Sequence, residues 1–369
     1  MVLDLRKFFR ATNPFPILTV SQPENWQYYI DFSAVRGSNL IQKLGRTIIF
    51  SEDEPTCQLV TGHIGCGKST ELSRLKNELE LKGFHIVHFK SFQSFQGLDR
   101  PYIDISGILL VIARQVSQSL EAVQIKLQPT RFQHILQGAA NLLSSDILEV
   151  INQELIEPAQ QQLKQQGKAG LVTIIDDLDR FGTQYKYLFI DQGEQLKKLK
   201  CHLVYTVPLV LMFSNDKENL TNRFGSDPQL LPMVRVQERD GSLCQEGIAL
   251  LRQMVLARAF PDVELEERLS LISEVFDTPE TLDRLCQVSG GYLRNLLVLL
   301  NSCFTKDDLP WSRDLVERLI SKRRNLLSMT FTLMSAEGSR YNRGGFIERS
   351  EYPQWFSGEM NADLQTIEC

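Results

Sequence analysis

One stretch of the sequence limits the possible folds more than any other. It reads Gly62-His63-Ile64-Gly65-Cys66-Gly67-Lys68-Ser69-Thr70 and matches the pattern G-x-x-x-x-G-K-[S/T]. A strand-like apolar run, residues 56–61, precedes it, and leucines at helical spacing follow it within residues 68–82, before a glycine that can stop a helix. The motif is therefore expected where a strand turns into a helix.

This pattern suits phosphate binding for physical reasons. Glycine has no Cβ, so the backbone can adopt positive φ and bring its N–H groups close to a phosphate at a helix N-terminus. Lys68 would supply a cation to the β- and γ-phosphates, and the Ser69 hydroxyl would ligate Mg²⁺. We therefore expect ATP and Mg²⁺ as cofactors. The residues expected at the nucleotide are Gly62, His63, Ile64, Gly65, Cys66, Gly67, Lys68, Ser69 and Thr70.

A second signal lies at residues 171–180, Leu-Val-Thr-Ile-Ile-Asp-Asp-Leu-Asp-Arg, where an apolar β-branched run ends in carboxylates. Ligands collect at the carboxyl edge of a parallel sheet, so Asp176 is expected to meet the Mg²⁺ held by Ser69. Asp177 is the candidate that orients the attacking water. Residues 202–208 predict another buried strand. Its Thr206 is a candidate for the γ-phosphate region, although a β-branched strand residue needs no functional reason.

The rest of the chain predicts an α/β fold: a three-layer P-loop NTPase core with a parallel sheet, then a smaller all-α lid domain. We expect a lead-in over 1–50 that covers the nucleotide base or seals the core edge, an ATPase core over 51–240, a helical domain over 241–330 and a flexible or docking tail over 331–369. Helices are predicted at 39–46, 68–82 and 104–120, one or two exposed helices within 122–168, and a strand at 85–90. Residues 214–231 are interpreted as loop-rich, with a short strand at 233–236.

Composition limits the location and the partners. The net charge of −5 gives no general reason to expect nucleic acid, and the longest apolar run, 203–213, is far shorter than a membrane span, so no membrane insertion is expected. Seven scattered cysteines without C-x-x-C spacing favour a reduced, cytoplasmic location. Cys66 is interpreted as a small residue that fills the loop, with a reactive thiol as the alternative.

These motifs together show a family resemblance. Residues 62–69 resemble a Walker A motif, residues 174–180 resemble the D-D-L-D-R form of Walker B, and residues 289–297, Ser-Gly-Gly-Tyr-Leu-Arg-Asn-Leu-Leu, are similar to the start of a lid helix in AAA+ proteins. The chain thus resembles AAA+ P-loop ATPases of the origin-recognition and STAND (signal-transduction) groups over roughly residues 30–327.

The resemblance implies further roles. Arg294 would be the second sensor, which reaches the γ-phosphate from the lid, and Thr206 would be the first. Arg223 is positioned like an arginine finger that acts on a neighbouring subunit. Many AAA+ ATPases carry Glu where this chain has Asp177, which implies slow hydrolysis. The short remainder after the lid is too small for the repeat array usual in the signal-transduction group.

Three functions follow from this sequence. The leading hypothesis is an Mg²⁺-dependent ATPase switch that couples ATP or ADP binding to conformation, to self-association or to a protein partner. The second is a DNA-associated AAA+ protein such as a loader or transposition regulator, for which the basic cluster Lys322-Arg323-Arg324 is weak support. The third is a small-molecule phosphotransferase, which shares the phosphate loop but not the Walker B and lid-like motifs.

Overall fold

The chain folds into two compact units. The computed structural model describes residues 3–326 apart from 17, 20–21, 38, 52–53, 92–103, 126, 128–130, 132–142 and 181–184, so the expected tail over 331–369 lies outside the described residues. The sheet unit comprises Asn39–Gly62 and Glu71–Leu230. The helical unit comprises the described parts of Met1–Ser38, His63–Thr70 and Leu231–Cys369. The phosphate motif is thus divided after Gly62.

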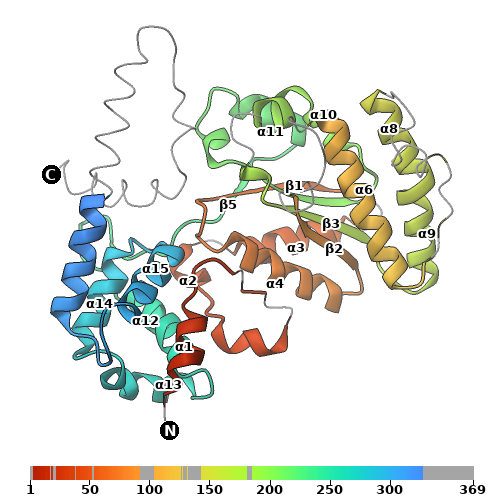
Figure 1. Cartoon of the computed structure of the whole chain (residues 1–369). Coiled ribbons are helices and arrows are strands. Elements are labelled where there is room, and N and C mark those ends of the chain that lie inside the picture. Colours follow the sequence, from red (N-terminus) through yellow and green to blue (C-terminus); the bar gives the residue numbers. More distant parts are fainter. Residues whose placement is uncertain are drawn as a thin grey trace. The chain divides into compact units, whose positions relative to one another are not determined.

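A parallel sheet forms the centre of the sheet unit (Figure 1). Its order is β2-β3-β4-β1-β5, and every neighbouring pair is parallel. Ile175 pairs with Tyr205 near the ends of β3 and β4, and Val60 pairs with Thr206 near the ends of β1 and β4. The carboxyl ends of these three strands therefore share one edge. The strands are β1 (Cys57–Thr61), β2 (His85–Lys90), β3 (Leu171–Asp176), β4 (His202–Thr206) and β5 (Gln229–Leu230).

Helices cover both faces of this sheet, as the alternation of strand side chains requires. One set of strand residues, including Leu59 and Tyr205, joins the apolar cluster built by α6 (Ile105–Ala122), α8 (Ser144–Ile151) and α9 (Glu157–Gln165). Helices α3 (Leu40–Phe50) and α4 (Lys68–Leu81) lie on the other side of the sheet (Figure 1). There Gly45 approaches Leu75, and the carbonyl of Leu44 accepts a hydrogen bond from Gln58 of β1. The expected three-layer α/β core is confirmed.

Three local predictions for this part of the chain were wrong. Residues 214–231 are not mainly loop, because they contain α11 (Lys217–Phe224) and β5. Residues 233–236 form no strand, so the last strand comes earlier than predicted. The helices within 122–168 are not simply exposed, because an apolar stripe through α8, η2 (Asn152–Ile156, a π-helix) and α9 is buried in the core. The remaining described elements of the sheet unit are η3 (Leu178–Arg180), η5 (Lys186–Asp191), α10 (Gly193–Lys197) and η6 (Leu209–Met212).

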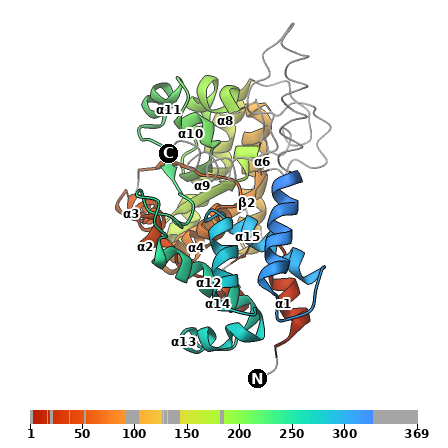
Figure 2. The ribbon, with the colours of Figure 1, turned by 90° about the vertical axis from the view of Figure 1, so that its left-hand side faces the viewer.

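The helical unit has its own apolar core, in which α12 packs against α1 and α14, and α14 packs against α15 (Figure 2). The ring of Phe8 in α1 lies 5.0 Å from that of Phe304 and 5.9 Å from that of Trp311, so the N-terminal segment is built into this core. The elements are α1 (Leu5–Ala11), η1 (Pro23–Tyr28), α2 (Ser33–Arg36), α12 (Gln245–Ala259), α13 (Leu265–Arg268), η7 (Leu269–Glu274), α14 (Pro279–Val288), α15 (Leu293–Phe304) and a last helix over 313–326. Among the described helices, none has the length and apolar content to span a bilayer.

Candidate functional site

The phosphate motif lies between β1 and α4, as the sequence predicts. Three of its glycines take backbone conformations that other residues rarely adopt: φ is +152° at Gly62, +89° at Gly65 and +104° at Gly67. Space also requires glycine at position 65, because a Cβ there would lie only 2.6 Å from Cε2 of Tyr292. The residue type at Gly65 is therefore fixed twice, by its backbone and by its neighbour.

Within the helical unit, residues 63–70 form a tight turn around the carbonyl of His63. Nζ of Lys68 donates to this carbonyl at 3.1 Å, and the N–H of Cys66 donates to it at 3.2 Å. Burial and the charge of Lys68 lower the pKa of His63, so its imidazole is neutral at pH 7. The thiol of Cys66 is completely buried, as expected for a residue that fills the loop. Ser69 and Thr70 follow, half-buried, in the first turn of α4.

Two arginines of the helical unit hold the carbonyls of this loop. The backbone N–H of Arg294, at the start of α15, donates to the carbonyl of Gly65 at 3.3 Å. The guanidinium of Arg36, at the end of α2, donates to the carbonyl of Cys66 at 2.5 Å and lies 5.3 Å from the centre of the Phe32 ring. The loop is therefore joined to both the N-terminal segment and the segment expected to be the lid.

Sequence reasoning missed Arg36 and gave no role to Tyr292. An arginine in the short stretch Val35-Arg36-Gly37 carries no recognisable pattern, so its place beside the loop could not be read from the chain. Tyr292 offered a better signal, because it lies between Gly290-Gly291 and Arg294 at the start of a helix. In the structure its side chain is 3% exposed and contacts the loop at Gly65.

A second group of polar residues lies at the carboxyl edge of the sheet. Asp176 ends β3 and is 1% exposed. Its Oδ1 accepts the backbone N–H of Asp177 at 2.8 Å, whereas its Oδ2 is buried without a hydrogen-bond partner among the described residues. An ionised carboxylate oxygen is costly to bury alone, and Mg²⁺ prefers oxygen ligands of this kind. The surroundings of Asp176 therefore fit the expected Mg²⁺ ligand.

Asp177 has an unusual conformation and an unusual charge environment. Its φ is +66°, and its Oδ1 forms an ion pair with Nε of Arg180 at 3.1 Å. Burial raises the pKa of Asp177, the charge of Asp176 raises it further, and the charge of Arg180 opposes this shift. The two neighbouring aspartates therefore differ: Asp176 has an oxygen without a partner among the described residues, and Asp177 is held by an arginine of the same motif.

The remaining predicted residues occupy different surroundings. Thr206 is fully buried at the end of β4, and its hydroxyl accepts the N–H of Leu178 at 3.1 Å, which fixes the turn after β3. Arg223, near the end of α11, packs its Cδ close to Gly193 of α10, and its Nη1 is buried without a partner among the described residues. Asp176, Asp177 and Thr206 are thus brought together at one sheet edge of the sheet unit, whereas Arg223 belongs to a separate helix pair.

Comparison with known proteins agrees with this architecture. A family model described as AAA ATPase domain matches residues 40–197, so the expected resemblance to AAA+ P-loop ATPases is confirmed there. A search of curated proteins found no match.

Similar solved structures include the Orc1 protein of Aeropyrum pernix in complex with DNA (14% identity, TM-score 0.42, 79% of this chain and 66% of that one). Cdc6p of Pyrobaculum aerophilum is similar at 14% identity and TM-score 0.41, over 81% of this chain and 65% of that one. NtrX of Brucella abortus in complex with ATP is similar at 15% identity and TM-score 0.36, over 90% of this chain and 68% of that one. The chain spans slightly less than two thirds of the first two proteins. The DNA and the ATP in these complexes belong to those proteins.

Proposed function

We propose that this chain binds ATP with Mg²⁺ and hydrolyses it slowly, as a switch that couples nucleotide state to conformation or self-association. One observation supports the switch: residues 63–70, the loop and the first turn of α4, belong to the helical unit, whereas β1 and the rest of α4 belong to the sheet unit. The carbonyls of Gly65 and Cys66 accept hydrogen bonds from Arg294 and Arg36. A phosphate that reshapes this loop would therefore act directly on helices α2 and α15.

In this proposal the basic side chains bind the phosphates, and the carboxylate of Asp176 binds Mg²⁺. Lys68 binds the β- and γ-phosphates, and the loop N–H groups around Gly65 and Gly67 hold the phosphate chain. Ser69 and Asp176 ligate Mg²⁺, which would neutralise charge on the phosphate oxygens. The buried Oδ2 of Asp176, which has no hydrogen-bond partner among the described residues, supports this assignment. Arg294 and Thr206 are proposed as the two sensors of the γ-phosphate.

Slow hydrolysis is proposed because of the surroundings of Asp177. Its carboxylate is engaged by Arg180 at 3.1 Å, so it must leave this ion pair before it can orient the attacking water. Its side chain is also one methylene shorter than the glutamate that many AAA+ ATPases carry there. Both features favour slow hydrolysis, so that ATP stays intact for long enough to hold the switch in one state.

The direct test is the binding of ADP and of a non-hydrolysable ATP analogue, measured by calorimetry with and without Mg²⁺. We expect Mg²⁺-dependent binding of the analogue that falls at least about tenfold in Lys68→Ala, because a charge-assisted contact is lost. Lys76→Ala is the matched control. Lys76 lies on the same helix, α4, but pairs with Glu80 at 3.7 Å, and its loss should leave affinity unchanged. Wild-type protein that binds neither nucleotide would disprove the proposal.

The alternative of DNA binding has one supporting observation. Lys322 and Arg324 are exposed on the helix over 313–326. Phosphate contacts by such residues would give an affinity for duplex DNA that falls steeply with salt. Absence of binding at low salt would remove this alternative without affecting the nucleotide proposal.

A further inference from the structure

The hydroxyl of Tyr292 has an unusual environment. It is buried, and no described residue provides it with a hydrogen-bond partner. Tyr205, another buried tyrosine, shows the usual arrangement, since its hydroxyl donates to the carbonyl of Leu196 at 3.1 Å. Buried hydroxyl groups normally find such partners, and an unsatisfied one destabilises the fold. The unpartnered hydroxyl of Tyr292 therefore calls for an explanation.

The position of Tyr292 beside the phosphate loop supplies an explanation. Tyr292 immediately precedes α15, and both its Cε2 and its hydroxyl lie within 2.8 Å of the point where a Cβ on Gly65 would be. The neighbouring Arg294 donates its N–H to the carbonyl of the same glycine. The tyrosine thus lies against the phosphate loop inside the helical unit, on a segment that is hydrogen-bonded to the loop.

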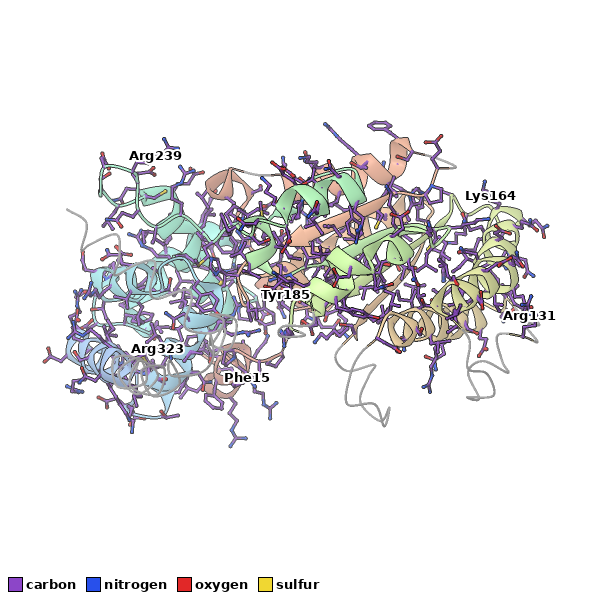
Figure 3. The ribbon with its side chains drawn as sticks, turned by 90° about the horizontal axis from the view of Figure 1, so that it is seen from above. Phe15, Arg131, Lys164, Tyr185, Arg239 and Arg323 are labelled. Atoms are coloured by element: carbon purple, nitrogen blue, oxygen red, sulfur yellow. The ribbon has the colours of Figure 1, made fainter. Side chains whose placement is uncertain are left out.

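The electrostatic surroundings also favour an anionic acceptor. Burial raises the pKa of Tyr292, whereas the charges of Arg294, Lys68 and Arg323 lower it. Arg323 comes from the helix over 313–326 (Figure 3). A neutral phenol among these cations keeps its O–H hydrogen and can donate it. Phosphate oxygens are the acceptors that such a cationic environment attracts.

We propose that the Tyr292 hydroxyl donates a hydrogen bond to an oxygen of the bound phosphate chain. This inference rests on the nucleotide binding proposed above and adds a ligand contact that the sequence motifs do not include. It gives the helical unit a neutral contact to the phosphates, separate from the charge of Arg294. Binding would then satisfy a hydroxyl for which no described residue provides a partner.

Replacing Tyr292 with Phe tests this directly, because the ring is kept and only the hydroxyl is lost. We expect the affinity for the ATP analogue, for ADP and for tripolyphosphate to fall about tenfold, the usual order for one hydrogen bond to a charged group. The melting temperature of the nucleotide-free variant should equal or exceed that of the wild type, because an unsatisfied buried group has been removed.

Tyr205→Phe is the matched control, with the opposite expectation. It removes a satisfied hydroxyl from the core of the sheet unit, so its nucleotide-free form should melt lower while its affinity stays unchanged. A Tyr292→Phe protein with wild-type affinity, or one whose nucleotide-free form melts lower like Tyr205→Phe, would overturn the inference. If wild-type protein binds none of the three ligands, the proposed function itself fails, so the two failures can be distinguished.

Discussion

Asp177 shows how much of the candidate site depends on the conformation of a single residue. Its φ of +66° is rare for a residue other than glycine and costs free energy, so it persists only where the surroundings hold it. Two hydrogen bonds do so: Oδ1 of Asp176 holds the N–H of Asp177, and the Thr206 hydroxyl holds the N–H of Leu178. Thr206 thus has a structural task, whether or not it also senses phosphate.

Gly65 allows a prediction at this scale. In Gly65→Ala the new methyl group would overlap Tyr292 and Arg294. The alanine would also be strained, because it would have to adopt the positive φ of Gly65. Gly225→Ala is the control, since Gly225 has a similar φ of +81° but nothing within 4 Å of the new Cβ. We expect Gly225→Ala to cost about 1 kcal/mol and Gly65→Ala about 1–3 kcal/mol more. Urea unfolding of both variants measures this; equal losses would mean that Tyr292 does not fill the space beside Gly65.

At the scale of elements, the sequence predicted best those helices and strands whose apolar residues recur at regular spacing. The strands at 85–90 and 171–176 and the helix after the phosphate motif have nearly the predicted bounds. Helix α11 was missed because its stretch is polar and has only Leu220 and Phe224 as buried residues. The contact of Tyr292 with Gly65 joins residues far apart in the chain, and local sequence patterns do not predict such long-range contacts.

The Gln-rich helix α9 gives a prediction at this scale. Its buried stripe includes Leu163, which is completely inaccessible to solvent. We expect Leu163→Ala to lower the free energy of unfolding by about 2–5 kcal/mol, whereas Gln161→Ala on the exposed face should change it very little. Guanidinium unfolding curves of the two variants provide the comparison. Equal effects would contradict the amphipathic arrangement.

At the scale of the whole molecule, each of the two units has an apolar core among its described residues. One lies between the sheet and helices α6, α8 and α9, and the other joins α1 to α12, α14 and α15. Each core draws on segments that are distant in sequence, and the chain passes from one unit to the other at residues 38, 62, 70 and 230. The expected division at residues 50 and 240 remains a prediction about domains, since the bounds of the compact units do not test it.

Self-association is predicted at this scale through Arg223. We expect light scattering to show a larger species with the ATP analogue, but not with ADP or without nucleotide. Arg223→Ala should prevent this assembly and keep the affinity for ATP, if the guanidinium leaves its site beside Gly193 to act on a neighbouring subunit. Arg239→Ala, an exposed arginine of the helical unit, is the control. A constant monomeric mass would instead favour a switch within one chain.

The division of the phosphate motif after Gly62 has a practical consequence for dissecting the molecule. A recombinant fragment spanning 39–230 would contain every strand and the complete Gly-Lys-Ser signature, yet it would lack Arg36, Tyr292 and Arg294, which support that signature from outside its boundaries. Truncation at these two boundaries therefore separates the motif from its supporting residues. Inactivity of such a fragment would be no argument against the intact chain.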